Sequence, residues 1–213
     1  MLTRPDSPRD VRALPAPAPT QLRVFRLLVA FALPWAGCGD FRTCPDVPAA
    51  TLDALPDTLS GTGLYADLST RTVSEDVISF TPRFPLWADG AEKDRWLELP
   101  EGGVVDASDM DSWRFPEGTR AWKAFAVDGV TVETRMLEKT GSGDADWAAV
   151  AYRWEGDDAV AVRDGAVDAN GTTHDIPTAE ECVACHGGRG SFILGFSAVQ
   201  LAGAEDVNAE TLV

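Results

Sequence analysis

The sequence predicts a mainly β domain, with an antiparallel sheet, short helices and one helix near the C-terminus. Two observations favour this class. From Ile78 onward, short runs rich in aromatic and β-branched residues alternate with turn signals, which is typical of strands. Asp128-Gly129 stands between two such runs and fits a two-residue hairpin turn. The expected strands cover residues 93–99, 119–127, 130–139, 147–154 and 159–163.

The second strand of this hairpin has an alternating pattern. Val130, Val132, Thr134 and Met136 should share one mainly apolar face, which we expect to pack on a core. The tryptophans of the β region should also be core residues, secondarily lining a pocket, because a buried indole contributes a large apolar area. These tryptophans are Trp87, Trp96, Trp113, Trp122, Trp147 and Trp154.

The N-terminal part has the pattern of an export leader. Residues 1–37 contain five arginines against two aspartates, and the apolar run 27–33 follows Arg23 and Arg26. This order indicates a signal peptide, here with an N-terminal extension. The run is much shorter than the roughly 20 apolar residues of a membrane span. We expect no transmembrane helix in the mature protein and membrane contact only through a lipid anchor.

The leader ends at Trp35-Ala-Gly-Cys38, which resembles the box where bacterial lipoproteins are cleaved and acylated on cysteine. This predicts lipidation at Cys38. The alternative is ordinary cleavage nearby, with Cys38 forming a disulfide with Cys44. Both alternatives export the chain to the periplasm or to the outer-envelope side of a bacterial membrane.

The charge balance excludes one broad class of function. The chain has 34 acidic and 18 basic residues, a net charge of −16, so it should not hold nucleic-acid phosphates. A redox partner would instead present a basic docking patch. The expected organisation is a leader over residues 1–37, a linker with a short helical segment over 38–77, and a β-rich domain over 78–213.

One motif carries specific chemistry. Cys182-Val-Ala-Cys185-His186 has the spacing of c-type haem attachment, in which two thiols add to the haem vinyl groups and the adjacent imidazole binds the iron. The alternatives are a thioredoxin-like Cys-x-x-Cys and half of a zinc site. A thioredoxin-like motif needs a βαβ setting, and zinc needs a second pair of ligands, and the sequence offers neither convincingly. We expect one covalently attached haem c, with His186 as the proximal ligand.

The local sequence around the motif predicts a short helix. Thr178 followed three residues later by Glu181 is a capping box. Gly187-Gly188 should end the helix directly after the motif.

Two resemblances follow from these residues. The segments Phe84-Pro-Leu-Trp87, Phe115-Pro-Glu-Gly-Thr119 and Ala151-Tyr-Arg-Trp154, together with the motif, resemble a family of exported bacterial c-type cytochrome-like proteins. The stretch 115–123 and the distant motif also resemble the β-sheet cytochromes c-prime-beta and their relatives with a lysine cross-linked to the haem, which oxidise hydroxylamine. The second resemblance implies a five-coordinate iron and makes Lys123 the cross-link candidate. The alternative for Lys123 is a solvated strand residue.

A six-coordinate iron would need a second axial ligand. The candidates are His174, Met136 and Met110, and the alternative for His174 is a surface histidine bonded to Asp175. Arg189, just after the motif, is a candidate partner for a haem propionate.

The sequence therefore predicts an exported mono-haem c-type protein acting in periplasmic electron transfer. The enzyme or ligand-binding alternative is a five-coordinate haem that binds or oxidises small nitrogen compounds such as nitric oxide or hydroxylamine. A third class is a non-redox haem sensor or an assembly protein.

Overall fold

The computed structural model describes residues 53–88, 90–187 and 192–203, and all of them belong to one folded unit. The predicted leader, Cys38, Cys44 and Arg189 lie outside the described residues. In the described part of the chain, no helix is long and apolar enough to cross a membrane.

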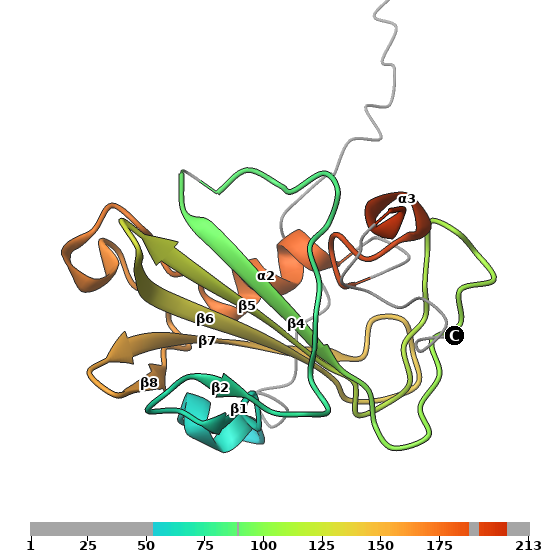
Figure 1. Ribbon diagram of the computed structural model, residues 1–213, viewed down its shortest axis with the longest axis horizontal. Helices are drawn as coiled ribbons and strands as arrows, with labels where there is room; N and C mark the ends of the chain where they lie inside the picture. Colours follow the sequence, from blue (N-terminus) through green and yellow to red (C-terminus); the bar gives the residue numbers. More distant parts are fainter. Residues whose placement is uncertain (1–52, 89, 188–191, 204–213) are drawn as a thin grey trace, which may run out of the picture. The chain divides into compact units, whose positions relative to one another are not determined.

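An antiparallel sheet forms the centre of the unit (Figure 1). Its six strands within the described residues follow sequence order, so each pairs with its neighbours along the chain. They are β3 (Ile78–Ser79), β4 (Glu92–Glu98), β5 (Arg120–Val127), β6 (Val130–Lys139), β7 (Trp147–Glu155) and β8 (Asp158–Ala161). The mainly β prediction is confirmed, and β4 to β8 lie within about three residues of the expected strands.

The β5–β6 hairpin turns at Asp128 and Gly129, whose φ angles are 51° and 78°. Both values are positive, as a type I′ turn requires, and Gly adopts such angles without steric cost. The register then shifts by one residue, because Ala126 pairs with Thr131 whereas Phe125 pairs with Glu133. Val132 is therefore the extra residue of a β-bulge.

Because of this bulge, the side chains predicted to share one face of β6 do not all do so. Val130 pairs with Val127, and Val127 and Phe125 line the same cavity, so Val130 lies on the face of Glu133 and not on that of Met136. Val130 is exposed. The unbroken alternation expected from the sequence fails because a bulge inserts one residue into the period of two.

One face of the sheet is covered by the N-terminal segment of the described chain. It contains η1 (Leu59–Thr62), β1 (Tyr65–Asp67) and β2 (Thr72–Val73), and β1 pairs with β2. The buried cluster on this face has members from the segment and from the sheet: Leu55, Leu59, Leu64, Trp96, Trp122, Ala124, Met136, Ala148, Val150, Tyr152, Trp154 and Ala159. Residues 53–77 are thus part of the folded unit, and η1 lies within the range 38–77 for which the sequence predicted a linker with a short helical segment.

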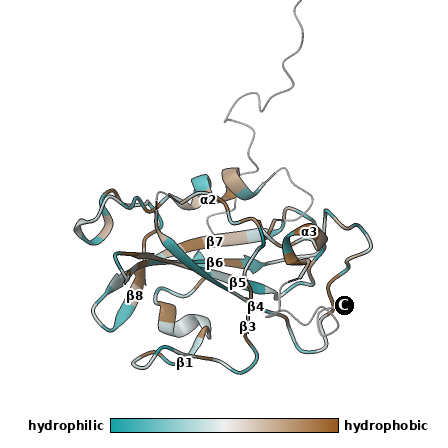
Figure 2. Cartoon of the chain, turned by 45° about the horizontal axis from the view of Figure 1, so that its top comes forward, coloured by the Kyte–Doolittle hydropathy of each residue, from teal (hydrophilic) through white to brown (hydrophobic). Residues whose placement is uncertain are grey.

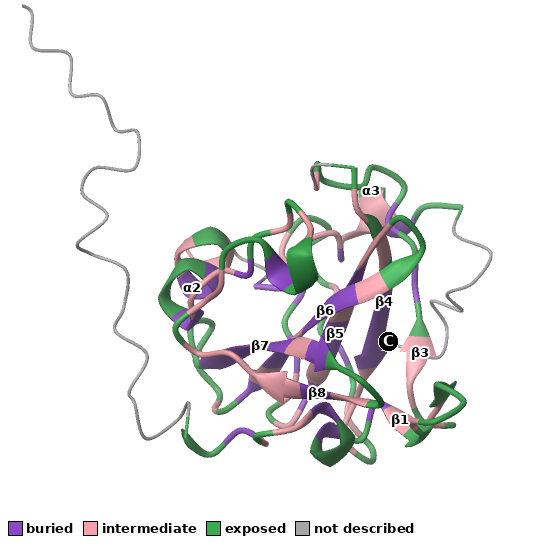
Figure 3. Ribbon diagram, turned by 90° about the vertical axis from the view of Figure 1, so that its left-hand side faces the viewer, coloured by how far each residue is buried: buried purple, intermediate pink, exposed green. Residues whose placement is uncertain are grey.

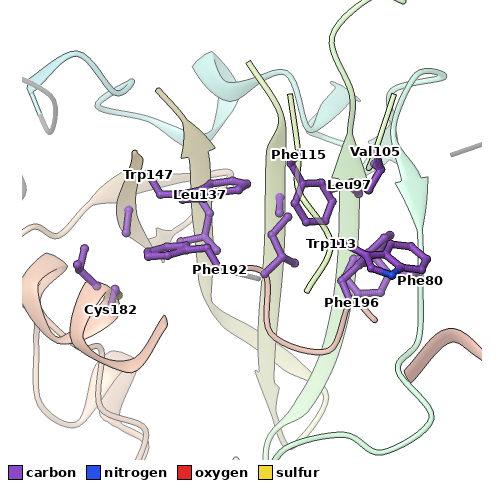
Figure 4. Close-up of a cluster of buried hydrophobic side chains, with 14 of the residues drawn as sticks. Phe80, Leu97, Val105, Trp113, Phe115, Leu137, Trp147, Cys182, Phe192 and Phe196 are labelled. Carbon is purple, nitrogen blue, oxygen red and sulfur yellow. The ribbon is translucent and has the colours of Figure 1, made fainter. Parts of the chain in front are cut away.

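The opposite face is covered by α2 (Ala179–His186), α3 (Ala198–Leu201) and the loops around them. Figure 3 shows the buried residues concentrated along the central strands between the two coverings. A second cluster packs here, and several of its aromatic rings meet edge to face, as between Phe80 and Phe196 and between Trp113 and Phe196 (Figure 4). Five of the six tryptophans of the β region are buried as predicted; Trp87 is 85% exposed.

Candidate functional site

Helix α2 carries the Cys-x-x-Cys-His motif, and its start is the predicted capping box. The Glu181 backbone N–H donates to Thr178 Oγ1 at 3.1 Å, and the Thr178 N–H donates to Glu181 Oε2 at 2.9 Å. The helix ends at His186, and the Gly187 N–H donates to the Val183 carbonyl at 2.7 Å. A Cβ on Gly187 would lie 2.9 Å from that carbonyl oxygen, so this end of the helix requires glycine.

A cavity of about 380 Å³ opens beside the motif, within the usual volume of small-molecule and cofactor sites. Helix α2 supplies one wall and strands β4, β5 and β6 supply another. The rim is formed by residues that precede β4: Pro82, Phe84, Leu86, Trp87, Ala88 and Ala91. The rim is apolar and exposed at Phe84, Leu86 and Trp87, which explains why Trp87 departs from the core position expected for it. The motif residues Cys182, Cys185 and His186 all line this one cavity.

The two cysteines differ in environment. Cys182 is buried and Cys185 is exposed, and both are free thiols. Burial raises the pKa of the Cys182 thiol to about 11, while Arg135 lowers it less strongly. A spacing of three residues places both thiols on neighbouring positions of the same helix surface. This arrangement presents two sulfur atoms to one ligand.

The His186 ring is oriented by two contacts. Its Nδ1 lies 2.7 Å from the carbonyl oxygen of Phe192. Because a carbonyl can only accept, Nδ1 carries the proton, and Nε2 is then the nitrogen with the lone pair in the neutral ring. The Phe192 ring lies 5.4 Å from the His186 ring and stacks on Trp147 at an interplanar angle of 5°. A hydrogen bond from the non-ligating nitrogen to a carbonyl is the usual way to orient a metal-binding histidine.

Three cations from three adjacent strands face the motif across the cavity. Arg95 on β4 pairs in register with Lys123 on β5, and Lys123 pairs with Arg135 on β6. All three line the cavity. Lys93, two residues before Arg95 on the same face of β4, lines it as well. We call Arg95, Lys123 and Arg135 the cation ladder. Figure 2 shows a hydrophilic stretch in β4, the strand that carries Lys93 and Arg95.

Burial and neighbouring cations lower the pKa values of lysines on this wall. Burial, followed by the charges of Arg135, Arg95 and Lys93, lowers the pKa of Lys123 to about 8. Burial also lowers the pKa of Arg95 and, with help from Arg95 and Arg135, the pKa of Lys93. Lys123 is therefore a lining residue of the cavity and not the solvated strand residue that was the alternative at the sequence level.

One carboxylate joins the ladder to the loop before α2. Glu133 is fully buried, and its Oε1 and Oε2 accept from Arg135 Nε at 2.5 Å and Nη2 at 2.8 Å. Glu133 Oε2 also lies 2.6 Å from His174 Nε2. The His174 ring packs 5.1 Å from Phe125 and lines the cavity. His174 is thus a half-buried partner of Glu133, and not the surface histidine bonded to Asp175.

The structure separates the remaining ligand candidates from this cavity wall. Met136 lies in the cluster on the opposite face of the sheet, where the Tyr152 hydroxyl contacts its sulfur at 3.9 Å. Met110 is 70% exposed and lies outside the residues that line the cavity. Met136 lines a small adjoining cavity together with His186, but its sulfur contacts Tyr152 on the other face of the sheet, so neither methionine sulfur is placed to serve as the second axial ligand.

Sequence reasoning missed Arg95, Arg135, Glu133 and Phe125 as site residues. The sequence signal was a spacing of two residues, between Lys93 and Arg95 and between Glu133 and Arg135. This spacing places both members of each charged pair on one face of a strand. That pattern alone is also typical of a solvated sheet face, so only the position of α2 distinguishes the two.

The donor set fits a c-type haem. Two thiols, one imidazole with an oriented ring and an adjoining cavity with apolar rim residues are together in space. Within the described residues, no group of three or more histidine, cysteine, aspartate or glutamate side chains could hold a metal ion by itself. Comparisons of the chain with protein-family models, with curated proteins and with solved structures find no match.

Proposed function

We propose that this protein is an exported mono-haem c-type protein whose cavity between α2 and strands β4–β6 holds one haem c. The observation that carries the proposal is the convergence of Cys182, Cys185 and His186 on one cavity, with His186 Nδ1 bonded to the Phe192 carbonyl. Haem would supply an iron that exchanges one electron or binds a small ligand. The leader predicted for residues 1–37 would take the chain to the compartment where c-type haem is attached.

Each residue of the motif would have a separate task. The Sγ–H of Cys182 and of Cys185 would each add across one vinyl group, forming one C–S bond and placing the hydrogen on the neighbouring carbon, so neither attachment needs an oxidant. His186 would bind the iron through Nε2, with its ring held by Phe192. Lys123 lies in the same cavity and keeps its place as the cross-link candidate that the family resemblance implies.

We further propose that the protein supplies a single axial ligand and that the opposite iron position takes a small ligand such as nitric oxide. Three placements support this. Met136 is on the other face of the sheet, Met110 is exposed, and His174 Nε2 is occupied by Glu133. This favours the five-coordinate alternative over a six-coordinate electron carrier. Hydroxylamine oxidation is the catalytic form of the same proposal.

The test is expression of the full chain in a bacterium that matures c-type haem, followed by a denaturing gel stained for haem peroxidase activity and by optical spectra. We expect a stained band that is lost in the double variant Cys182→Ala/Cys185→Ala. We also expect a high-spin ferric spectrum and nitric oxide binding in the ferrous state. An unstained band would overturn haem attachment, whereas a stained, low-spin protein insensitive to nitric oxide would restore the electron-transfer prediction.

A further inference from the structure

We propose that the cation ladder is an anion-binding wall, which recognises carboxylate or other small anionic groups of whatever occupies the cavity. The proposal rests on the proposed function for both sources of the anion, and the first source is the two propionates of a haem. The other source is a free small anion bound beside the iron. The observation that carries the proposal is the placement of Arg95, Lys123 and Arg135 opposite one another on one cavity wall.

The geometry of the ladder is unfavourable without an anion. Side chains directly opposite on adjacent antiparallel strands are about 4.5–5.5 Å apart at Cβ, and like charges in this position are destabilising. Here two such like-charge pairs occur in succession, Arg95 with Lys123 and Lys123 with Arg135. Burial is the main cause of the lowered pKa of Lys123, and the charges of Arg135, Arg95 and Lys93 lower it further.

The ladder is also short of compensating charge. Among the described residues, the ion pairs include one from the ladder, Arg135 with Glu133, and none to Arg95 or Lys123. Glu133 is shared with His174 and offsets the charge of Lys123 only in part. Arg95 donates instead to a neutral group, the Lys93 carbonyl, at 3.2 Å.

This local excess of positive charge stands in a chain of net charge −16. Random placement of charges would surround a cavity of this chain with carboxylates. Among its described lining residues, this cavity instead has four lysines and arginines, all on β4 to β6, and two carboxylates, Asp175 and Glu181. Arginine binds carboxylates through paired N–H groups, and lysine adds a point charge. Partial burial strengthens both interactions because the local dielectric is low. The wall therefore fits a ligand with one or two carboxylates, or a compact anion.

The first arm of the experiment uses the full chain without haem and measures quenching of tryptophan fluorescence by haemin and by haemin dimethyl ester, which has no carboxylates. The variants are Arg95→Gln and Lys123→Met. Lys123→Met keeps an apolar stem of similar length, so it remains informative if Arg95→Gln fails to fold. Arg153→Gln is the matched control, because Arg153 lies on β7 of the same sheet, outside the cavity lining, and pairs with Glu155.

For the propionate source, we expect the wild type to bind haemin at least about tenfold more tightly than the ester, the size of one charged hydrogen bond. Both ladder variants should bring this ratio close to one, and Arg153→Gln should leave it unchanged. This measurement needs no covalent haem, so it can succeed even if the stained gel shows that haem attachment does not occur.

The second arm uses the haem-loaded protein and compares azide, an anion, with imidazole, a neutral ligand. For the free-anion source, the ladder variants should weaken azide binding at least about tenfold and leave imidazole binding unchanged. An ester that binds as tightly as haemin, together with azide binding that is equal in wild type and variants, would overturn the anion-binding wall.

Discussion

Nε2 of His174 lies 2.6 Å from Oε2 of Glu133, and this contact joins the loop before α2 to strand β6. Glu133 is fully buried and also binds Arg135 through both carboxylate oxygens. The ring nitrogen through which histidine would most simply bind iron is thus held by a carboxylate. His174 is close enough to line the cavity but is positioned as a partner of Glu133.

The first prediction concerns axial ligation. His174→Gln should leave the spin state and the absorption maxima of the haem-loaded protein unchanged, because His174 does not bind the iron in the proposed arrangement. Optical and electron paramagnetic resonance spectra of wild type and variant make the comparison. A change from low spin to high spin in the variant would show instead that His174 is the second axial ligand.

The second prediction concerns the buried carboxylate. Glu133→Gln should lower the free energy of unfolding by about 1.5–3 kcal/mol, because it removes the buried counter-charge of the half-buried Arg135 and the charged hydrogen bonds between them. Urea unfolding followed by tryptophan fluorescence gives the value. The control is Glu155→Gln, which removes the exposed partner of Arg153 and should cost less than about 1 kcal/mol. Equal losses in the two variants would contradict the role of Glu133.

The third prediction is a pH dependence in the haem-free protein. The pKa of Lys123 is about 8 in the folded chain because of burial and the nearby Arg135, Arg95 and Lys93, only partly offset by Glu133, and is about 10.4 in an unfolded chain. Between these values the unfolded chain binds more protons, so the free energy of unfolding should rise with pH. The rise from Lys123 is at most about 3 kcal/mol, since one pKa unit equals about 1.4 kcal/mol.

Below pH 8 both states keep the proton, and the destabilisation by Lys123 is fully present. Urea unfolding of wild type and Lys123→Met at pH 7 and pH 10 separates this residue from other groups that titrate. Lys123→Met should be more stable than wild type at pH 7, and the difference should shrink at pH 10. A difference that is the same at both pH values would exclude a depressed lysine pKa.

The fourth prediction concerns thiol reactivity before haem is attached. At pH 8 iodoacetamide should modify Cys185 readily, because it is exposed, and Cys182 much more slowly, because its thiol is buried with a pKa of about 11. Peptide mass spectrometry after timed quenching gives both rates in one sample. Unfolding the protein in urea should bring the two rates together. Rapid modification of Cys182 in the folded chain would mean that α2 does not pack on the sheet as described.

The fifth prediction tests whether residues 53–77 belong to the fold. Leu59 is completely buried in η1, so Leu59→Ala should lower the free energy of unfolding by about 2–5 kcal/mol. Val167→Ala is the control, because Val167 is 79% exposed and its truncation should change stability by less than about 0.5 kcal/mol. A stability loss as small for Leu59→Ala would mean that this segment is a linker after all.

Several local features could be predicted from the sequence because neighbouring residues decide them. The Thr178–Glu181 capping box depends on groups three residues apart, and the structure contains both of its hydrogen bonds. The positive φ angles of Asp128 and Gly129 follow from the turn that joins two adjacent strands. The spacing of the motif likewise needs only one helix to place two thiols and an imidazole together.

Only the tertiary structure decided which residues form the cavity wall opposite the motif. In a β5–β6 hairpin without a bulge, the two-residue turn would pair Lys123 with Thr134. The bulge at Val132 shifts the register so that Lys123 pairs with Arg135. Arg95 joins the same row from a strand separated by a long connection. Sheet register reflects the packing of both faces, and a shift of one residue reverses which side chains face the core. By itself the sequence determined the strands, the capped helix and the haem motif, whereas long-range pairing decided which charges face that motif.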